Sequence, residues 1–281
     1  MKRIILFVVT NLALMVVLST VCAVLGVDPS TTTGMLVFAL IFGMGGAVVS
    51  LLLSKRMAKW STGARTIDGT EGETESWLVR TVEQLAGQAG IGMPEVAVYP
   101  GAANAFATGA FRNRALVAVS TGLLEGMPRA EVRAVLGHEI GHVANGDMVT
   151  MTLLQGVLNA AVLLLARVIG VAVDRAVFGT RRGVGIGYYL TRMALQLVLG
   201  MLASLVVMAY SRRREFAADA SAANYLGSPS DMIRALQRLG SLTPGALPAS
   251  MKAFGINSQP GWAHLFSSHP PLEARIARLS G

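Results

Sequence analysis

Residues 34–54 read GMLVFALIFGMGGAVVSLLLS, a run of 21 amino acids that contains no charge. About 20 apolar helical residues are needed to cross the roughly 30 Å hydrocarbon core of a bilayer. An earlier run, from Ile4 to Val27, is also uncharged, over 24 residues. We predict that both runs are transmembrane helices and form an N-terminal hairpin over 1–54. A signal peptide or a buried hairpin in a soluble protein is the alternative, but the length of the runs and their succession favour an uncleaved membrane anchor.

Two later apolar runs, 148–166 and 193–210, are bordered by Arg167 and Arg192. They predict a second transmembrane hairpin over 149–210. The overall composition agrees, since 53% of the residues are hydrophobic and only 14% are charged, against about 25% charged residues in ordinary soluble domains. The sequence therefore predicts a mainly helical integral membrane protein.

The basic residues predict an orientation in the membrane. Six lysines and arginines flank the first hairpin, whereas its connecting loop, VDPSTTT at 27–33, has none. Cytoplasmic loops are enriched in Lys and Arg, so both ends of this hairpin are expected in the cytoplasm, together with the domain at 55–148. Arginines 212–214 agree with this orientation. Three arginines in the loop between the later spans oppose it: Arg175, Arg181 and Arg182.

Charge and cysteine content narrow the range of partners. The formal net charge of +8 suits the anionic lipid headgroups at the inner surface of a membrane. Nucleic acid is not an expected partner, because the basic residues lie mostly at span ends and aromatic residues do not alternate with them. The single cysteine, Cys22, lies in the first span, so no intramolecular disulfide is possible.

Outside the spans the chain predicts an α+β domain with a small sheet. Residues 61–76, STGARTIDGTEGETES, are expected to be a flexible linker because they are rich in Gly, Thr and Ser. A helix with apolar residues on one face follows. Short strands are predicted at 94–100 and 114–120, with a strand or hairpin between them, so the sheet has four strands or fewer. Two short helices are expected to close the chain, at 231–239 and 271–279.

The stretch AVLGHEIGHVAN, at 134–145, places two histidines one helical turn apart, with a glutamate directly after the first. On a helix, His138 and His142 share one edge and can point at the same ion, while Glu139 falls inside an apolar stripe. The stripe consists of Val132, Val135, Leu136 and Val143. Because an ionised glutamate is rarely buried without a partner, the H-E-x-x-H pattern predicts a catalytic zinc site with Glu139 as its proton acceptor. Two hydrogen-bonded histidines on a half-exposed helix are the alternative.

A catalytic zinc ion usually has three protein ligands, so a third ligand is required. A histidine six residues after His142 is excluded, because that residue is Met148. A carboxylate from a later helix is therefore expected. The acidic residues after His142 are Asp147, Asp174, Glu215, Asp219, Asp231 and Glu273.

Topology favours Glu215 among these candidates. The histidines precede the third span and Glu215 follows the fourth, so an antiparallel hairpin returns Glu215 to the same membrane side. Asp174 lies at the opposite end of that hairpin, and Asp147 is close to His142 along the chain. Asp219 shares a helical face with Glu215 and is expected to accept a hydrogen bond from a ligating histidine. A solvated acidic face beside arginines 212–214 is the alternative.

Three motifs resemble the bacterial HtpX membrane proteases, which belong to a wider group containing the prenyl-protein endopeptidases of eukaryotes. They are HEIGHVANGDMVTMTLLQG at 138–156, SRRREFAADASAA at 211–223 and LFSSHPPLEARIARL at 265–279. The resemblance spans nearly the whole chain. It implies a zincin-like (gluzincin) protease domain whose C-terminal part is 211–281. It also implies a location in the bacterial inner membrane, with the active site facing the cytoplasm.

The resemblance further implies a zinc-dependent endopeptidase engaged in quality control of membrane or misfolded proteins. By residue matching, His138, His142 and Glu215 would bind one Zn²⁺ and Glu139 would be catalytic. Asp219 would support a ligand from outside the coordination sphere. The implied substrates are polypeptides, and no sequence feature indicates an oligomeric state.

Two further site residues are expected. His269, in SSHPP, is a candidate second electrophile for the oxyanion of the tetrahedral intermediate, chiefly because the resemblance implies it. A capping histidine before Pro270 is the alternative. Asn104 opens NAFATG, which offers an edge strand along which a substrate backbone would bind by strand addition. An ordinary hairpin is the alternative there.

Two functions without proteolysis compete with this interpretation. A zinc-binding membrane scaffold would need the ligands but would have no use for Glu139. A transporter would need ionisable residues deep in its spans, and Arg167 and Arg192 both lie close enough to span ends to snorkel. The presence of Glu139 and the position of the arginines favour the protease.

Overall fold

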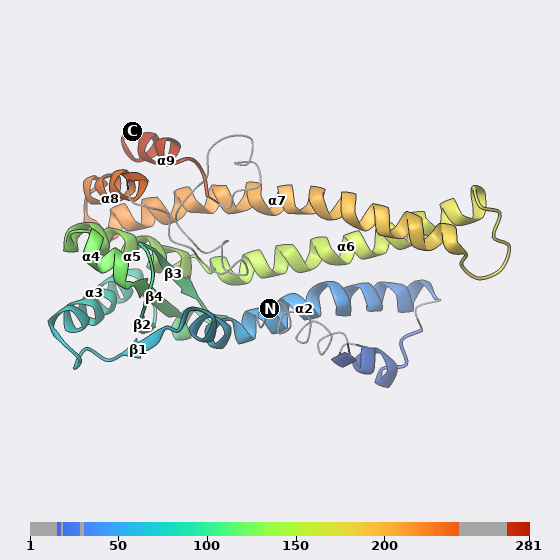
Figure 1. Ribbon diagram of the computed structural model, residues 1–281, viewed down its shortest axis with the longest axis horizontal. Helices are drawn as coiled ribbons and strands as arrows, with labels where there is room; N and C mark the ends of the chain where they lie inside the picture. The colour runs from blue at the N-terminus through green and yellow to red at the C-terminus, as the bar shows by residue number, and fades with distance from the viewer. Residues whose placement is uncertain (1–15, 18, 29–30, 242–268) are drawn as a thin grey trace. The chain divides into compact units, whose positions relative to one another are not determined.

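The computed structural model describes residues 16–17, 19–28, 31–241 and 269–281 (Figure 1). The greater part of the predicted first span lies outside these residues. The chain divides into two compact units. The helical unit consists of Met1–Ser50 and Thr152–Val207, and the mixed unit consists of Leu51–Met151 and Met208–Gly281.

Three long helices are apolar and long enough to cross a membrane: α2 (Thr32–Thr62), α6 (Asp147–Ala176) and α7 (Ile186–Leu226). The 41 residues of α7 span about 60 Å, at 1.5 Å per residue, which is twice the thickness of the hydrocarbon core. Its charged end, from Arg212 onward, therefore continues past the apolar stretch into the mixed unit. The chain is a mainly helical membrane protein.

Two glycines let α2 and α6 approach closely within the helical unit. A Cβ atom on Gly43 would lie 2.4 Å from the backbone nitrogen of Ala160. One on Gly156 would lie 3.1 Å from the side chain of Met44. Backbone contact of this kind is how helices associate in lipid, where burial of apolar surface gives no advantage.

The mixed unit contains a four-stranded sheet in the order β1-β2-β4-β3 (Figure 1). Strands β2 and β4 are parallel, and the other two pairs are antiparallel. The strands are β1 (Arg65–Ile67), β2 (Glu95–Tyr99), β3 (Ala105–Thr108) and β4 (Leu116–Ser120). The prediction of four strands or fewer is confirmed.

The predicted linker at 61–76 is wrong in its middle part. Arg65–Ile67 pairs with β2 as an edge strand, with Ile67 buried in the core, and α3 (Glu73–Ala89) begins before the predicted linker ends. Composition suggested a flexible segment because Gly, Thr and Ser surround the strand. A single buried isoleucine at the correct register is enough to hold so short a strand against its neighbour.

Helices cover both faces of the sheet. On one face, α3, α5 (Arg129–Ala144) and α8 (Ser230–Ser241) share a single apolar core with the strands. On the other face, Ala58 in the last turns of α2 packs against Phe106, Leu116 and Ala118. Shorter helices complete the unit: η1 (Arg112–Arg114), α4 (Thr121–Gly126) and α9 (Leu272–Leu279).

Helix α5 is enclosed on all sides. Every residue from Ala134 to Val143 is buried, because α5 packs against α3, β3 and α8. The apolar stripe predicted for this helix is therefore not a distinct face, and a half-exposed helix is excluded. Both histidines and Glu139 lie in the interior of the mixed unit.

Candidate metal centre

Two histidines and a glutamate from two helices converge on one point. His138 and His142 lie on α5 and Glu215 lies on α7. The two Nε2 atoms are 3.1 Å apart. Glu215 Oε1 lies 3.2 Å from His142 Nε2, and Glu215 Oε2 lies 3.5 Å from His138 Nε2. Among the described residues, no other group of three or more His, Cys, Asp or Glu gathers its ligand atoms within 4.8 Å.

Two glycines on α5 explain how α7 comes so close. A Cβ on Gly137 would lie 3.5 Å from Ala222, and one on Gly141 would lie 3.0 Å from Ser221 Cβ and 3.2 Å from the carbonyl oxygen of Ala218. Each glycine directly precedes one of the histidines in sequence. The small faces of α5 and α7 thus meet backbone to backbone, and this contact brings the acidic side chains of α7 to the histidines.

Each histidine has its other ring nitrogen against a carboxylate. His138 Nδ1 lies 2.8 Å from Asp219 Oδ1, and His142 Nδ1 lies 2.6 Å from Asp147 Oδ2. An ionised carboxylate only accepts hydrogen bonds, so Nδ1 carries the proton and Nε2 presents a lone pair. When the imidazoles are neutral, their two lone pairs and the Glu215 carboxylate therefore face one another. Buried acceptors arranged in this way favour a positive charge among them, either a proton on an imidazole or a metal ion.

The spacing of these atoms fits a tetrahedral metal ion. With bonds of about 2.0–2.1 Å, neighbouring ligand atoms of a tetrahedral zinc site are roughly 3.3 Å apart. The separations of 3.1, 3.2 and 3.5 Å lie around that value. Two imidazoles and one carboxylate are also a donor set that binds zinc in proteins.

The electrostatics of the cluster favour positive charge at the same point. Burial and the charge of Arg275 lower the pKa of His138, but its hydrogen bonds to Asp219 and Glu215 outweigh them, so this pKa is raised. Burial raises the pKa of Glu215, yet the nearby His269 and His142 hold it well below its usual range. Both shifts have the sign expected of a group of buried acceptors that attracts a cation.

Asp219 is held in its ionised form by Arg275, which is fully buried. Arg275 Nε donates to Asp219 Oδ2 over 2.8 Å, and its Nη2 donates to Oδ1 over 2.5 Å. Burial raises the pKa of Asp219, but these hydrogen bonds and the charge of Arg275 lower it to about 2. Asp219 is therefore available as a fixed acceptor for His138 Nδ1.

Glu139 is buried on α5 between the two histidines in sequence. Burial, and then the negative charge of Glu139, raise the pKa of Tyr99 on β2. The carboxylate is thus close enough to the sheet for its charge to act on a phenol there. Tyr99 has no counterpart among the residues predicted from sequence.

His269 lies against the ligand cluster. Its Nδ1 is 2.6 Å from Glu215 Oε2, and its side chain is buried. Helix α9 begins after Pro271 without a side-chain hydrogen bond at its N-cap. The structure therefore brings His269 to Glu215, and the N-cap of α9 is Pro271 rather than His269.

Asn104 directly precedes β3 and contacts β4. Its N–H donates to Ser120 Oγ over 2.8 Å, and its carbonyl accepts from the Ser120 N–H over 2.9 Å. In an antiparallel pair the bonding direction alternates, so Ala105 and Ala107 direct their N–H and C=O groups away from β4, toward the edge of the sheet. The structure thus places Asn104 at the start of an edge strand that packs against α5.

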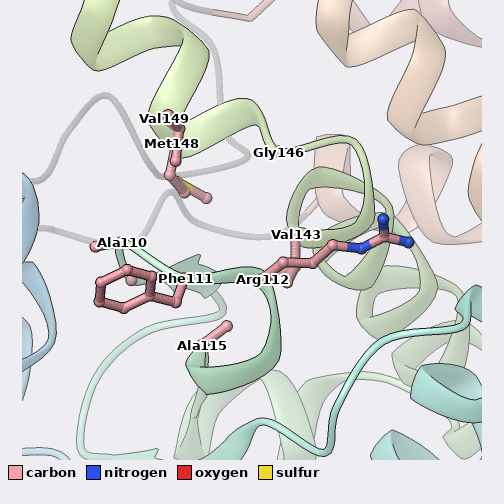
Figure 2. Close-up of a pocket in the computed structure, with 9 residues that line it drawn as sticks. Ala110, Phe111, Arg112, Ala115, Val143, Gly146, Met148 and Val149 are labelled. Carbon is pink, nitrogen blue, oxygen red and sulfur yellow. The ribbon is translucent and has the colours of Figure 1, made fainter.

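A small apolar pocket follows the end of β3. It is lined by the turn after β3 and by the junction of α5 and α6, with Phe111, Val143, Met148 and Val149 among its residues. Figure 2 shows Phe111 and Arg112 pointing in opposite directions from this turn. Arg112 also lines the pocket, and its guanidinium donates to the carbonyl oxygen of Ala89.

The sequence prediction omitted three charged contacts of the site. Arg275 appeared only within a quoted motif, Arg214 as one of three topogenic arginines, and Asp147 as a candidate ligand too near in sequence. The sequence contained one signal for Asp147, because the glycine directly before it, Gly146, favours a reversal of the chain. In the structure Gly146 has a φ of +70°. No local pattern indicates that Arg275 is buried, since α9 alternates charged and apolar residues as a surface helix does.

Comparison with known proteins gives the following matches. Residues 73–281 match peptidase family M48. A protease HtpX homolog of Bordetella pertussis is 58% identical over 287 residues, which cover 99% of this chain and 98% of that protein. One of Herminiimonas arsenicoxydans is 56% identical over 289 residues, which cover 99% of both.

The fold is similar to that of a solved structure, the crystal structure of S. mikatae Ste24p. The TM-score is 0.69, with 18% sequence identity, and the match covers all of this chain. The chain spans 65% of the length of that protein. This similarity concerns the architecture alone.

Proposed function

The chain belongs to peptidase family M48 and is a membrane metalloprotease, and on that premise we propose that it is a zinc-dependent endopeptidase. The proposed ligands are His138, His142 and Glu215. The observation that carries the proposal is the convergence of two imidazole lone pairs and one carboxylate at separations of 3.1–3.5 Å. When bound, the ion would supply Lewis acidity, which polarises a peptide carbonyl and makes water acidic near neutral pH.

Glu139 is the proposed proton carrier. It is not needed as a ligand, it is buried, and it follows the first histidine on the same helix. In the proposed reaction its carboxylate takes a proton from the attacking water and then gives it to the leaving amine. A scaffold that only bound zinc would gain nothing from a carboxylate buried at this position, at a cost in desolvation.

His269 is the proposed stabiliser of negative charge on the scissile carbonyl oxygen. The support is its position, since a buried imidazole 2.6 Å from Glu215 can direct an N–H into the same space. Asp219 is proposed to fix His138 rather than to bind the ion. Its support is the pair of contacts to His138 Nδ1 and to the Arg275 guanidinium.

The edge of the sheet is the proposed binding surface for substrate. An extended peptide would pair with the outward N–H and C=O groups of Ala105 and Ala107, two residues that are buried in this structure, with Asn104 at the start of the strand. Continuing along the edge, it would meet the apolar pocket beside Phe111 and Met148. We propose apolar segments of membrane or misfolded proteins as substrates, and proteolytic quality control as the role.

The proposed location is the bacterial inner membrane, with the site facing the cytoplasm. The hairpins would comprise 1–54 and 149–210, and the protease domain would comprise 55–148 and 211–281. Support comes from the loop at 27–33, which contains no Lys or Arg and lies between basic flanks. A cysteine introduced at Ser30, in a chain whose Cys22 is replaced by Ser, should react with an impermeant thiol reagent added to intact cells. One at Thr70 should react only after lysis, and the reverse pattern would contradict the orientation.

The function itself is tested with Glu139→Gln in the purified full-length protein. The variant should hold about one zinc ion per chain, as the wild type does, because the ligands are untouched. Its cleavage of casein should fall at least a hundredfold, since general base catalysis is worth about 10²- to 10⁴-fold. Metal content is measured by elemental analysis, and cleavage is measured after chelation and after zinc is restored. A variant that holds zinc and cleaves at the wild-type rate would contradict the mechanism, and a wild type that holds zinc but never cleaves would favour the scaffold.

A further inference from the structure

Asp147, the first residue of α6, turns back onto His142. The two residues are five apart in sequence, and His142 Nδ1 lies 2.6 Å from Asp147 Oδ2. Gly146 makes this reversal possible, because its φ of +70° is the left-handed conformation that glycine adopts without steric cost. Asp147 is buried. Asp147 therefore contacts His142 Nδ1 in the same way that Asp219 contacts His138 Nδ1.

A largely buried arginine holds Asp147 in turn. Arg214 Nη2 donates to Asp147 Oδ2 over 2.7 Å, and Nη1 donates to the Asp147 backbone carbonyl over 2.5 Å. One planar guanidinium thus fixes both the side chain and the backbone of the same residue, which a lysine ammonium would not do. The Arg214 side chain is 13% exposed, whereas its neighbour Arg213 is exposed.

These contacts connect the first residue of α6 and the charged part of α7 to one histidine, His142. Asp147 begins α6, and Arg214 lies on α7 one residue before Glu215. All of these residues belong to the mixed unit. A shift of α6 against α7 at this level would move the carboxylate that orients the His142 ring.

A role in stability alone does not account for the ion pair between Asp147 and Arg214. A buried ion pair contributes little net stability, because desolvation offsets the attraction between its charges. The same carboxylate oxygen, Asp147 Oδ2, contacts both the guanidinium and the imidazole. The ion pair therefore holds its carboxylate at the position that fixes the proton on Nδ1 and leaves the Nε2 lone pair facing Glu215.

We propose that Asp147 and Arg214 are positioning residues for His142, and that they couple the orientation of this metal ligand to the packing of α6 against α7. The inference rests on the proposed function, because it gives His142 a metal ion to bind. It predicts that the two residues act on metal affinity and on coordination geometry together. It also predicts that Arg214 acts through Asp147.

The test uses the full-length protein in detergent, stripped of metal and titrated with Co²⁺ against a chelating dye. Arg214→Gln should weaken Co²⁺ binding about 10- to 100-fold, the usual loss when an outer partner of a ligand is removed. It should also change the visible absorption bands of the bound Co²⁺, which report ligand geometry. Arg214→Lys should recover only part of the affinity. Arg213→Gln, the matched control on the next residue, should bind Co²⁺ as the wild type does.

A double-mutant cycle tests the route of action. If Arg214 acts through Asp147, the loss in Asp147→Asn/Arg214→Gln should be clearly smaller than the product of the two single losses. Wild-type Co²⁺ affinity and absorption bands in Arg214→Gln would overturn the inference, and so would independent losses in the cycle. If Arg214→Gln does not fold, the affinity and bands of Asp147→Asn decide in its place. A wild type that binds no metal would instead overturn the proposed function, and this inference with it.

Discussion

Two buried aspartates in different units show two ways of keeping a carboxylate away from water. Asp174 in the helical unit is 1% exposed, and Asp219 in the mixed unit is 2% exposed. Asp174 accepts the backbone N–H groups of Gly185 and Tyr188, over 2.7 and 3.1 Å, at the first turn of α7. Asp219 accepts instead from the guanidinium of Arg275 and the imidazole of His138.

The difference lies in what the partners do next. Backbone amides have no further bond to make, so the contacts of Asp174 close the turn between α6 and α7 and end there. The imidazole that binds Asp219 has a second nitrogen, and that nitrogen faces Glu215 and the other histidine. Burial of an acid is therefore no sign of a metal site by itself. A metal site is indicated when the buried acid contacts a side chain, such as an imidazole, whose other nitrogen presents a lone pair to further ligand atoms.

Glu215→Ala tests this rule at the metal ligands, where the series of hydrogen-bonded partners ends. It has the largest expected effect. Without the carboxylate only two protein ligands remain, so zinc content should fall from about one ion per chain to a small fraction. Casein cleavage should be lost with it. Elemental analysis of the dialysed protein gives the readout. Glu273→Ala on α9, also acidic but exposed, is the control and should keep full zinc. Stoichiometric zinc in Glu215→Ala would remove Glu215 from the ligand set.

Asp219→Asn should have an intermediate effect. The amide oxygen can still accept from His138 Nδ1, but the charge that balances the buried Arg275 is gone. Zinc affinity should therefore fall about 10- to 100-fold, without loss of the site. Competition with a zinc chelator measures the change. An affinity within twofold of the wild type would show that the contact to Asp219 does not support His138.

Much of this arrangement follows from local sequence patterns. The uncharged runs at 34–54, 148–166 and 193–210 correspond to α2, α6 and α7, because length and apolar composition alone decide whether a helix suits a bilayer. Glu215 was selected by topology, since a hairpin returns the chain to the side from which it left. The grouping of Glu215 with the histidines needed no knowledge of side-chain packing.

The contacts that the sequence did not predict all depend on packing between distant segments. Arg275 lies 56 residues after Asp219 in sequence, and its burial depends on how α9 docks. The burial of α5 could not be predicted for a similar reason. Glycines 137 and 141 allow the close approach of α7, but the sequence does not show that α7 packs against them. β1 was missed because three residues are too few to show an alternating pattern.

Asp174→Asn applies the Asp219 substitution to the other unit and should have the smallest effect on the site. The two oxygens of Asp174 each accept one N–H, from Gly185 and from Tyr188. Asparagine has one oxygen, so one of these two N–H groups would face an amide NH₂ and lose its acceptor, at a cost of about 1–3 kcal/mol if that group is buried. The melting temperature of the purified protein should therefore fall by a few degrees. Zinc affinity and casein cleavage should stay within twofold of the wild type, because no partner of Asp174 continues to a metal ligand. A loss of zinc affinity as large as that of Asp219→Asn would mean that a carboxylate closed off by backbone amides still acts on the site, and the distinction between the two aspartates would be wrong.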